Sequence, residues 1–285
     1  MRCLRLYRLS RGRRIGEHPS MTDLTGRAVA VLQEADPQQK ARLARVMAAD
    51  WSNGEIAERG RDKPPDRPNR PTHPLLKRPG EVPRRRINRG TAGRIALLHA
   101  LAHIELNAID LACDILARFT AEQMPDAFYD DWLLVAEEEG KHFLLLSERL
   151  TELGAAYGEL PAHDGLWQAA EETAHDLLAR LAVVPLVLEA RGLDVTPNMI
   201  TKLQAVEDHE SAAVLEVIYE DEIGHVAIGK RWFDHLCGTR NLDPRETWLS
   251  LVRLHFKGQV KPPFNAAARD SAGFPADFYE ALALP

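Results

Sequence analysis

The chain has 285 residues, of which 45% are hydrophobic and 27% are charged, and its formal net charge is −6. This composition is that of a soluble globular protein whose length allows a substantial core. The three cysteines form no CxxC pair, which argues against a disulfide scaffold and against a cysteine-rich zinc site. No apolar run approaches the roughly 20 residues that span a bilayer. We therefore expect a cytoplasmic protein with free thiols and no membrane contact.

Residues 1–21 are basic but lack the long apolar segment of a secretory signal. We expect them to be disordered or to precede the native start, with Met21 as the natural beginning. Residues 22–93 form an extension in two parts. Alanine and leucine recur at helical spacing over 27–32 and 39–49, and seven prolines follow between positions 64 and 83. Since proline disrupts helix interiors, the second part should run extended over the surface.

Charge is distributed unevenly along the chain. The first 94 residues contain 22 Lys and Arg against 10 Asp and Glu, whereas the remainder contains 14 against 32. Such a split fits a contact with nucleic acid, and it fits equally a basic arm that wraps its own acidic bundle. The arginines that would contact RNA are Arg84, Arg85, Arg86 and Arg89. No aromatic residues alternate with them to form a stacking platform, so both interpretations stay open.

Four long helical segments are predicted at 94–119, 126–153, 165–191 and 198–236. A short turn joins the first two, and a longer loop rich in Gly, Pro, His and Asp joins the second to the third. Two helix pairs separated by one long connection are typical of a ferritin-like four-helix bundle with one crossover. We predict an all-α protein with this bundle at 94–238, followed over 239–285 by a short helix and a tail that pack on the bundle.

The second and fourth segments each contain Glu-x-x-His within an apolar stripe. Glu139 and His142 interrupt the first stripe, and Glu222 and His225 interrupt the second. Residues three apart lie one above the other on the same helix face. Burying an unpaired carboxylate costs many kcal/mol, so each glutamate must be paired, neutralised or bound to a metal ion.

The first and third segments each place a single glutamate, Glu105 and Glu189, among apolar neighbours. Glu105 precedes Glu139 by 34 residues and Glu189 precedes Glu222 by 33, so each half repeats the same helical hairpin. One Glu from each of two helices and one Glu-x-x-His from each of the others is the ligand set of carboxylate di-iron and di-manganese bundles. Four carboxylates and two imidazoles without a thiolate favour two iron ions, with manganese as the alternative.

An acidic residue, Glu138 or Asp221, precedes the glutamate of each Glu-x-x-His. A metal-bound histidine usually donates its other N–H to a carboxylate, and a residue offset by one position leans toward the neighbouring helix. We predict that Asp221 partners His142 and that Glu138 partners His225, with plain surface carboxylates as the alternative. Tyr219 lies one turn before the glutamate of the fourth segment. It is either a core side chain, which we favour, or a phenol close to the metals.

The chain resembles the ferritin-like bacterial family catalogued as domain of unknown function 455 in five runs: ALLHALAHIELNAIDLA, FYDDWLLVAEEEGKHF, YGELPAHDGLW, VPLVLEARGLDVTP and YEDEIGHVAIGKRWF. The resemblance covers roughly residues 22–260. More distantly, the bundle is similar to the non-haem di-iron tRNA hydroxylases and to the ferritin, rubrerythrin and ribonucleotide-reductase superfamily. This resemblance implies the fold and a metal site at the same six residues, but it implies no reaction. The basic extension, which ferritins lack, argues against an iron-storage cage.

Three functions are open at this point. The first, which we favour, is an O2-activating di-iron oxidoreductase of the hydroxylase or monooxygenase type, which needs an electron donor and a substrate. That substrate is unknown; a modified RNA base and a small metabolite both fit. The second is a ferroxidase or peroxide-scavenging protein, and the third is a non-enzymatic interaction module stabilised by metal. A homodimer is compatible with each of them.

Overall fold

The computed structural model describes residues 21–77, 81–82, 87 and 90–283. The segment 1–20 and the four arginines considered for an RNA contact lie outside the described residues. Within the described part the protein is all-α, as predicted, and its β pairing is limited to two isolated bridges, Asp23 with Glu58 and Leu76 with Ala162.

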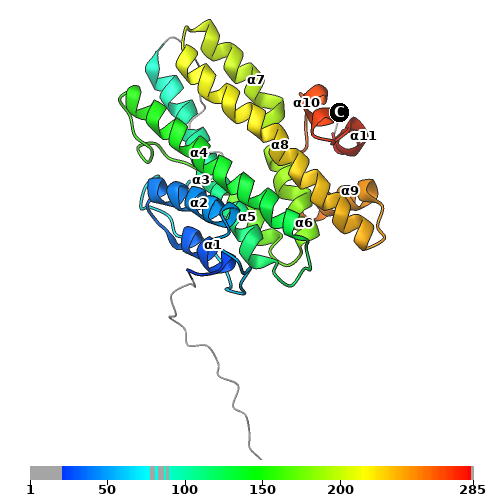
Figure 1. Cartoon of the computed structure of the whole chain (residues 1–285). Helices are drawn as coiled ribbons and strands as arrows, with labels where there is room; N and C mark the ends of the chain where they lie inside the picture. The colour runs from blue at the N-terminus through cyan, green and yellow to red at the C-terminus, as the bar shows by residue number, and fades with distance from the viewer. Residues whose placement is uncertain (1–20, 78–80, 83–86, 88–89, 284–285) are drawn as a thin grey trace, which may run out of the picture.

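The N-terminal extension holds α1 (Leu24–Gln33) and α2 (Pro37–Ser52). The bundle contains α3 (Thr91–Arg118), α4 (Asp126–Glu152) and α8 (His209–Thr239). Its remaining arm is composite: α6 (Leu177–Val183), the π-helix η2 (Val184–Glu189) and α7 (Ala190–Ala205), with the short α5 (Gly165–Glu172) before it. The tail comprises α9 (Pro244–His255), α10 (Ala266–Ser271), α11 (Ala276–Tyr279) and the 3-10 turn η3 (Glu280–Leu282) (Figure 1).

The second hairpin departs from the prediction at two places. A helix does begin at Gly165, but the predicted third segment is interrupted at 173–176 before α6 begins at Leu177. The interval 192–197, predicted as a connection, lies inside α7. The helix passes through Pro197 because its missing N–H is compensated. The carbonyl of Leu193, which that N–H would have met, accepts a hydrogen bond from Asn265 Nδ2 at 3.2 Å.

The true break in this hairpin lies at 206–208. Glu207 adopts a left-handed backbone conformation with φ of 64°. Asp208 then begins α8 as its N-cap, accepting from the backbone N–H of Ser211 at 3.1 Å. The buried Asp208 carboxylate also accepts from Arg94 of α3 at 2.7 Å and from Arg149 of α4 at 2.9 Å. One carboxylate thus joins the end of the second hairpin to both helices of the first.

Helix α3 is buried on nearly all sides. The face opposite Glu105 carries polar residues at helical spacing, namely His99, His103, Asn107, Asp110 and Asp114, and all of them are buried. The partners of three of them come from α2, from the proline-rich segment and from α6. Lys40 of α2 donates to Asp110 at 2.6 Å, Arg70 donates to Asn107 at 2.7 Å, and Arg180 donates to Asp114 at 2.6 Å. The contact of Arg70 ties the proline-rich segment to α3.

Among the described helices, α3 alone is long and apolar enough to cross a membrane, which corrects the expectation that no such run exists. Its apolar window has a mean hydropathy of 1.4, and 78% of that window is buried inside the protein. A buried window of this kind belongs to the core helix of a soluble protein, since a membrane span would present it to lipid.

The two hairpins meet along α4 and α8. Helices α1 and α2 cover the outer side of α3 and α4, while α9, α10 and α11 lie on the far side of α8 (Figure 1). The core between these layers is continuous and rich in leucine, alanine and aromatic side chains. The two hairpins are therefore covered by further helices on both sides.

Candidate metal centre

Six polar side chains from four elements lie in the middle of this apolar core. Glu105 comes from α3, Glu139 and His142 from α4, Glu189 from the last position of η2, and Glu222 and His225 from α8. Glu139 and His142 are fully buried, and Glu105 and His225 nearly so. Glu222 is slightly open, with 13% of its side chain exposed.

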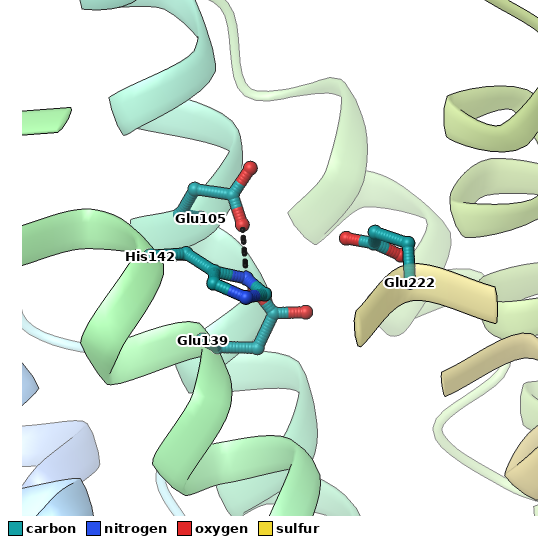
Figure 2. Close-up of side chains that lie close together, drawn as sticks. All are labelled: Glu105, Glu139, His142 and Glu222. Atoms are coloured by element: carbon teal, nitrogen blue, oxygen red, sulfur yellow. Dashed lines mark ion pairs between the residues drawn. The ribbon is translucent and has the colours of Figure 1, made fainter. Parts of the chain in front are cut away.

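Glu139 lies between the two histidines. Its Oε1 is 3.1 Å from His225 Nδ1, and its Oε2 is 3.5 Å from His142 Nδ1. Glu105 approaches His142 Nδ1 at 3.4 Å, and Glu222 approaches His225 Nδ1 at 3.8 Å. One donor atom from each of Glu105, Glu139, His142 and Glu222 lies within 4.8 Å of the other three, and Figure 2 shows these side chains converging from three helices.

The six side chains share an unusual property: each has at least one buried atom without a hydrogen-bond partner. These atoms are Glu105 Oε2, both oxygens of Glu139, His142 Nδ1, Glu189 Oε2, Glu222 Oε2 and His225 Nδ1. Leaving a buried polar atom unsatisfied costs about 1–3 kcal/mol, and more when it is charged. Four of these side chains, Glu105, Glu139, His142 and Glu222, bring their ligand atoms close enough together to hold a metal ion by carboxylate and imidazole.

The outer nitrogens of both histidines are held by carboxylates. His142 Nε2 lies 2.9 Å from Asp221 Oδ2, and His225 Nε2 lies 2.9 Å from Glu138 Oε2. These are the two pairs that the sequence pattern predicts. Donation from Nε2 to a carboxylate leaves Nδ1 as the free ligand atom, and both Nδ1 atoms point at the central cluster.

The six side chains strongly perturb one another. Burial, and then repulsion from Glu139, raises the pKa of Glu105 to about 8. The same causes raise the pKa of Glu189 to about 7 and that of Glu222 well above its ordinary value. Burial opposes protonation of His142, but Glu105 and Glu139 raise its pKa to about 11. The cluster therefore retains several protons at neutral pH, and a bound cation would replace them.

For Glu139 the balance is reversed. Burial alone would raise the pKa of Glu139, but the neighbouring His142 and His225 lower it below the ordinary range of a glutamate. The pKa of His225 is raised well above its ordinary value, because contacts with Glu138 and Glu139 outweigh the burial of the ring. Glu139 is thus the carboxylate that stays charged at the centre of the cluster.

The π-helix η2 ends at the ligand position Glu189. A proline inside a helix ordinarily produces a kink, and at Pro185 the structure has a π-helical turn. Pro185 packs directly on α8 at Gly229, where a Cβ atom would lie only 2.3 Å from Pro185 Cβ. Gly229 therefore permits the close approach of the two helices immediately beyond the ligands.

Tyr219 is linked to the C-terminal tail. Its Oη accepts from Asn265 Nδ2 at 2.8 Å, and the backbone N–H of Asn265 donates to Asp194 of α7 at 2.9 Å. The hydrogen bond of Tyr219 therefore joins α8 to the segment before α10.

Comparison with known proteins places the chain in a family. The sequence model of the family described as "Protein of unknown function (DUF455)" matches residues 33–280. The chain belongs to the DUF455 family. An uncharacterized protein of Haemophilus influenzae (strain ATCC 51907 / DSM 11121 / KW20 / Rd) is 40% identical to this DUF455 chain over 257 residues, which cover 85% of the chain and 88% of that relative. No solved structure matches it.

Sequence reasoning missed one functional contact in this DUF455 chain. Lys141 Nζ donates to Asp221 Oδ2 at 2.5 Å, so Asp221 serves a lysine and a histidine together. The sequence contains a feature that could have predicted this contact: Lys141 directly precedes His142, and the second Glu-x-x-His segment has no lysine at the equivalent position.

Replacing Glu189 with leucine should stabilise the DUF455 protein when metal is withheld with a chelator. Glu189 has a buried oxygen without a partner, so an apolar side chain of similar size removes a desolvation cost. We expect a gain of about 1–2 kcal/mol in the free energy of unfolding by urea. Glu148→Leu, at an exposed position of α4, is the control and should change it by less than about 0.5 kcal/mol. A clear loss of stability in Glu189→Leu would mean that this carboxylate serves the fold.

Proposed function

We propose that this protein is a dinuclear metal protein of the ferritin-like superfamily that oxidises an organic substrate with O2, as a di-iron hydroxylase or monooxygenase does. The observation that supports this most directly is the convergence of seven buried, unpartnered donor atoms from six side chains. Carboxylate and imidazole ligands without thiolate favour iron, with manganese second. The buried free thiols of Cys113 and Cys237 are consistent with a reducing cytoplasm.

Some of these residues would bind the metal ions, and others orient the residues that bind them. Glu139 faces both histidines, and it would hold the metal ions together with Glu105, His142, Glu189, Glu222 and His225. Asp221 and Glu138 fix the orientation of the two imidazoles. Bound iron would supply the O2 and electron-transfer chemistry. The surrounding apolar core excludes bulk water, and Glu222 is the partly exposed member of the cluster.

The proposal is tested by loading the protein anaerobically with ferrous iron and measuring iron per chain. We expect two ions per chain and, on exposure to air, a ligand-to-metal charge-transfer band in the near ultraviolet. An oxygenase should then take up O2 faster when its substrate and an electron donor are added together. Repeated oxidation of excess ferrous iron without a substrate would instead identify a ferroxidase. Binding of no metal by a folded protein would leave an interaction module and sink the proposal.

A further inference from the structure

The two Glu-x-x-His segments repeat each other, with one marked difference. In α4 the run is Glu138-Glu139-Gly140-Lys141-His142, and in α8 it is Asp221-Glu222-Ile223-Gly224-His225. An acid precedes the glutamate in both runs. The residue directly before the histidine is a lysine in α4 and a glycine in α8.

This difference changes the surroundings of only one histidine. Asp221 accepts from His142 Nε2 at 2.9 Å and from Lys141 Nζ at 2.5 Å. Glu138 accepts from His225 Nε2 at 2.9 Å, and no lysine or arginine in the described part of the chain pairs with it. Gly224, which occupies the place equivalent to Lys141, is exposed. The twofold repeat of the site is therefore broken in the groups behind the ligands.

The ion pair between Lys141 and Asp221 should lower the affinity for a metal ion beside His142. A carboxylate that accepts from a histidine N–H makes that imidazole a stronger donor to a cation. An ammonium on the same oxygen draws negative charge away from the carboxylate. The carboxylate therefore accepts a weaker hydrogen bond from His142 and increases the donor strength of the imidazole less. The ammonium also repels a cation bound at Nδ1 of that ring. Both effects disfavour a metal ion beside His142.

We propose that the two metal positions are inequivalent: Lys141 weakens the position formed by Glu105 and His142, so the position formed by Glu189, Glu222 and His225 fills first. Lys141 is a positioning residue in this scheme, since it acts on the metal through Asp221 and His142. The inference rests on the proposed dinuclear site. Beyond that site, the inference states which of the two metal positions fills first and names Lys141 as the residue that sets this order.

Solvent moderates the size of the effect. The side chain of Lys141 is 31% exposed and that of Asp221 is 22% exposed, so their charges are partly screened. Direct partners of metal-bound histidines usually change affinity by about 10–100-fold, and Lys141 acts one contact further out. We therefore expect a difference of about threefold to tenfold between the two binding steps from this lysine.

The test is a titration of the full-length chain with Mn²⁺, in which the EPR signal of the free ion gives two stepwise dissociation constants. Lys141→Met should tighten the weaker step by about threefold to tenfold and leave the tighter step unchanged. Gly224→Lys should weaken the tighter step by a similar factor, because it places the missing lysine beside Glu138. A Cβ atom at Gly224 meets nothing within 4 Å, so the side chain fits. The double variant should restore the gap between the steps.

Lys202→Met, at an exposed position in the last turn of α7, is the control for a change in net charge and should move neither step. The inference is overturned if the wild type binds two ions with equal affinity, or if Lys141→Met moves both steps together or neither. It is also overturned if Gly224→Lys widens the gap. Fewer than two Mn²⁺ per wild-type chain would overturn the proposed function together with it, so the two failures can be told apart.

Discussion

Replacing Glu139 with alanine should abolish the binding of both metal ions while leaving the helical fold intact. Glu139 is the one carboxylate whose two oxygens face different histidines, at 3.1 and 3.5 Å, so its loss removes a ligand from both positions. We expect each dissociation constant to rise by more than about 100-fold, beyond the range seen when only an outer partner of a ligand is lost.

The measurement is metal content after equilibrium dialysis against ferrous iron or Mn²⁺, together with far-ultraviolet circular dichroism. Glu148→Ala is a matched control, because Glu148 lies on the same helix but is exposed. The control should bind two ions per chain as the wild type does. If Glu139→Ala also kept two ions, the metals would bind elsewhere and the assignment of the central cluster would be wrong.

The buried carboxylate and histidine cluster could be predicted from sequence because it depends on local periodicity. Glu105, Glu139 and Glu222 each interrupt an apolar stripe, and an acid within such a stripe is informative regardless of how distant segments pack. The pairings of His142 and His225 with acids across the α4–α8 interface follow from the same helical geometry. They needed only the assumption that the two helices are neighbours.

The features that sequence did not predict depend on contacts between distant segments. The continuation of α7 through Pro197 needs Asn265, 68 positions later in the sequence, to satisfy the carbonyl of Leu193. The π-helical turn at Pro185 is accommodated by Gly229 on another helix. Local propensity treats proline as a break or kink, and tertiary contacts override it here.

The polar face of α3 is a third such case. Asp110 and Asp114 sit in a helix apolar enough to resemble a membrane span, and their partners Lys40 and Arg180 come from α2 and α6. The sequence shows the acids at helical spacing, but it does not show which cations reach them.

Metal affinity should fall steeply as the pH is lowered, because protons and cations compete for the same donor atoms. In protein stripped of metal, the pKa of Glu105 is raised to about 8 and that of His142 to about 11, so both groups hold a proton at pH 7. Each proton displaced on binding changes the dissociation constant about tenfold per pH unit. Displacement of these two protons alone predicts that binding weakens at least about 100-fold between pH 7 and pH 6, and the raised pKa values of Glu222 and His225 add to this.

The slope should become shallower above pH 8, where Glu105 has already lost its proton and metal binding no longer displaces it. Mn²⁺ dissociation constants measured from pH 6 to pH 9 test this, and proton release during titration in a weakly buffered solution gives an independent count. An affinity that does not change over this range would contradict the prediction, since it would mean that no buried acid or imidazole is deprotonated on binding. Such a result would place the metals at ordinary surface carboxylates, which are already ionised at pH 6.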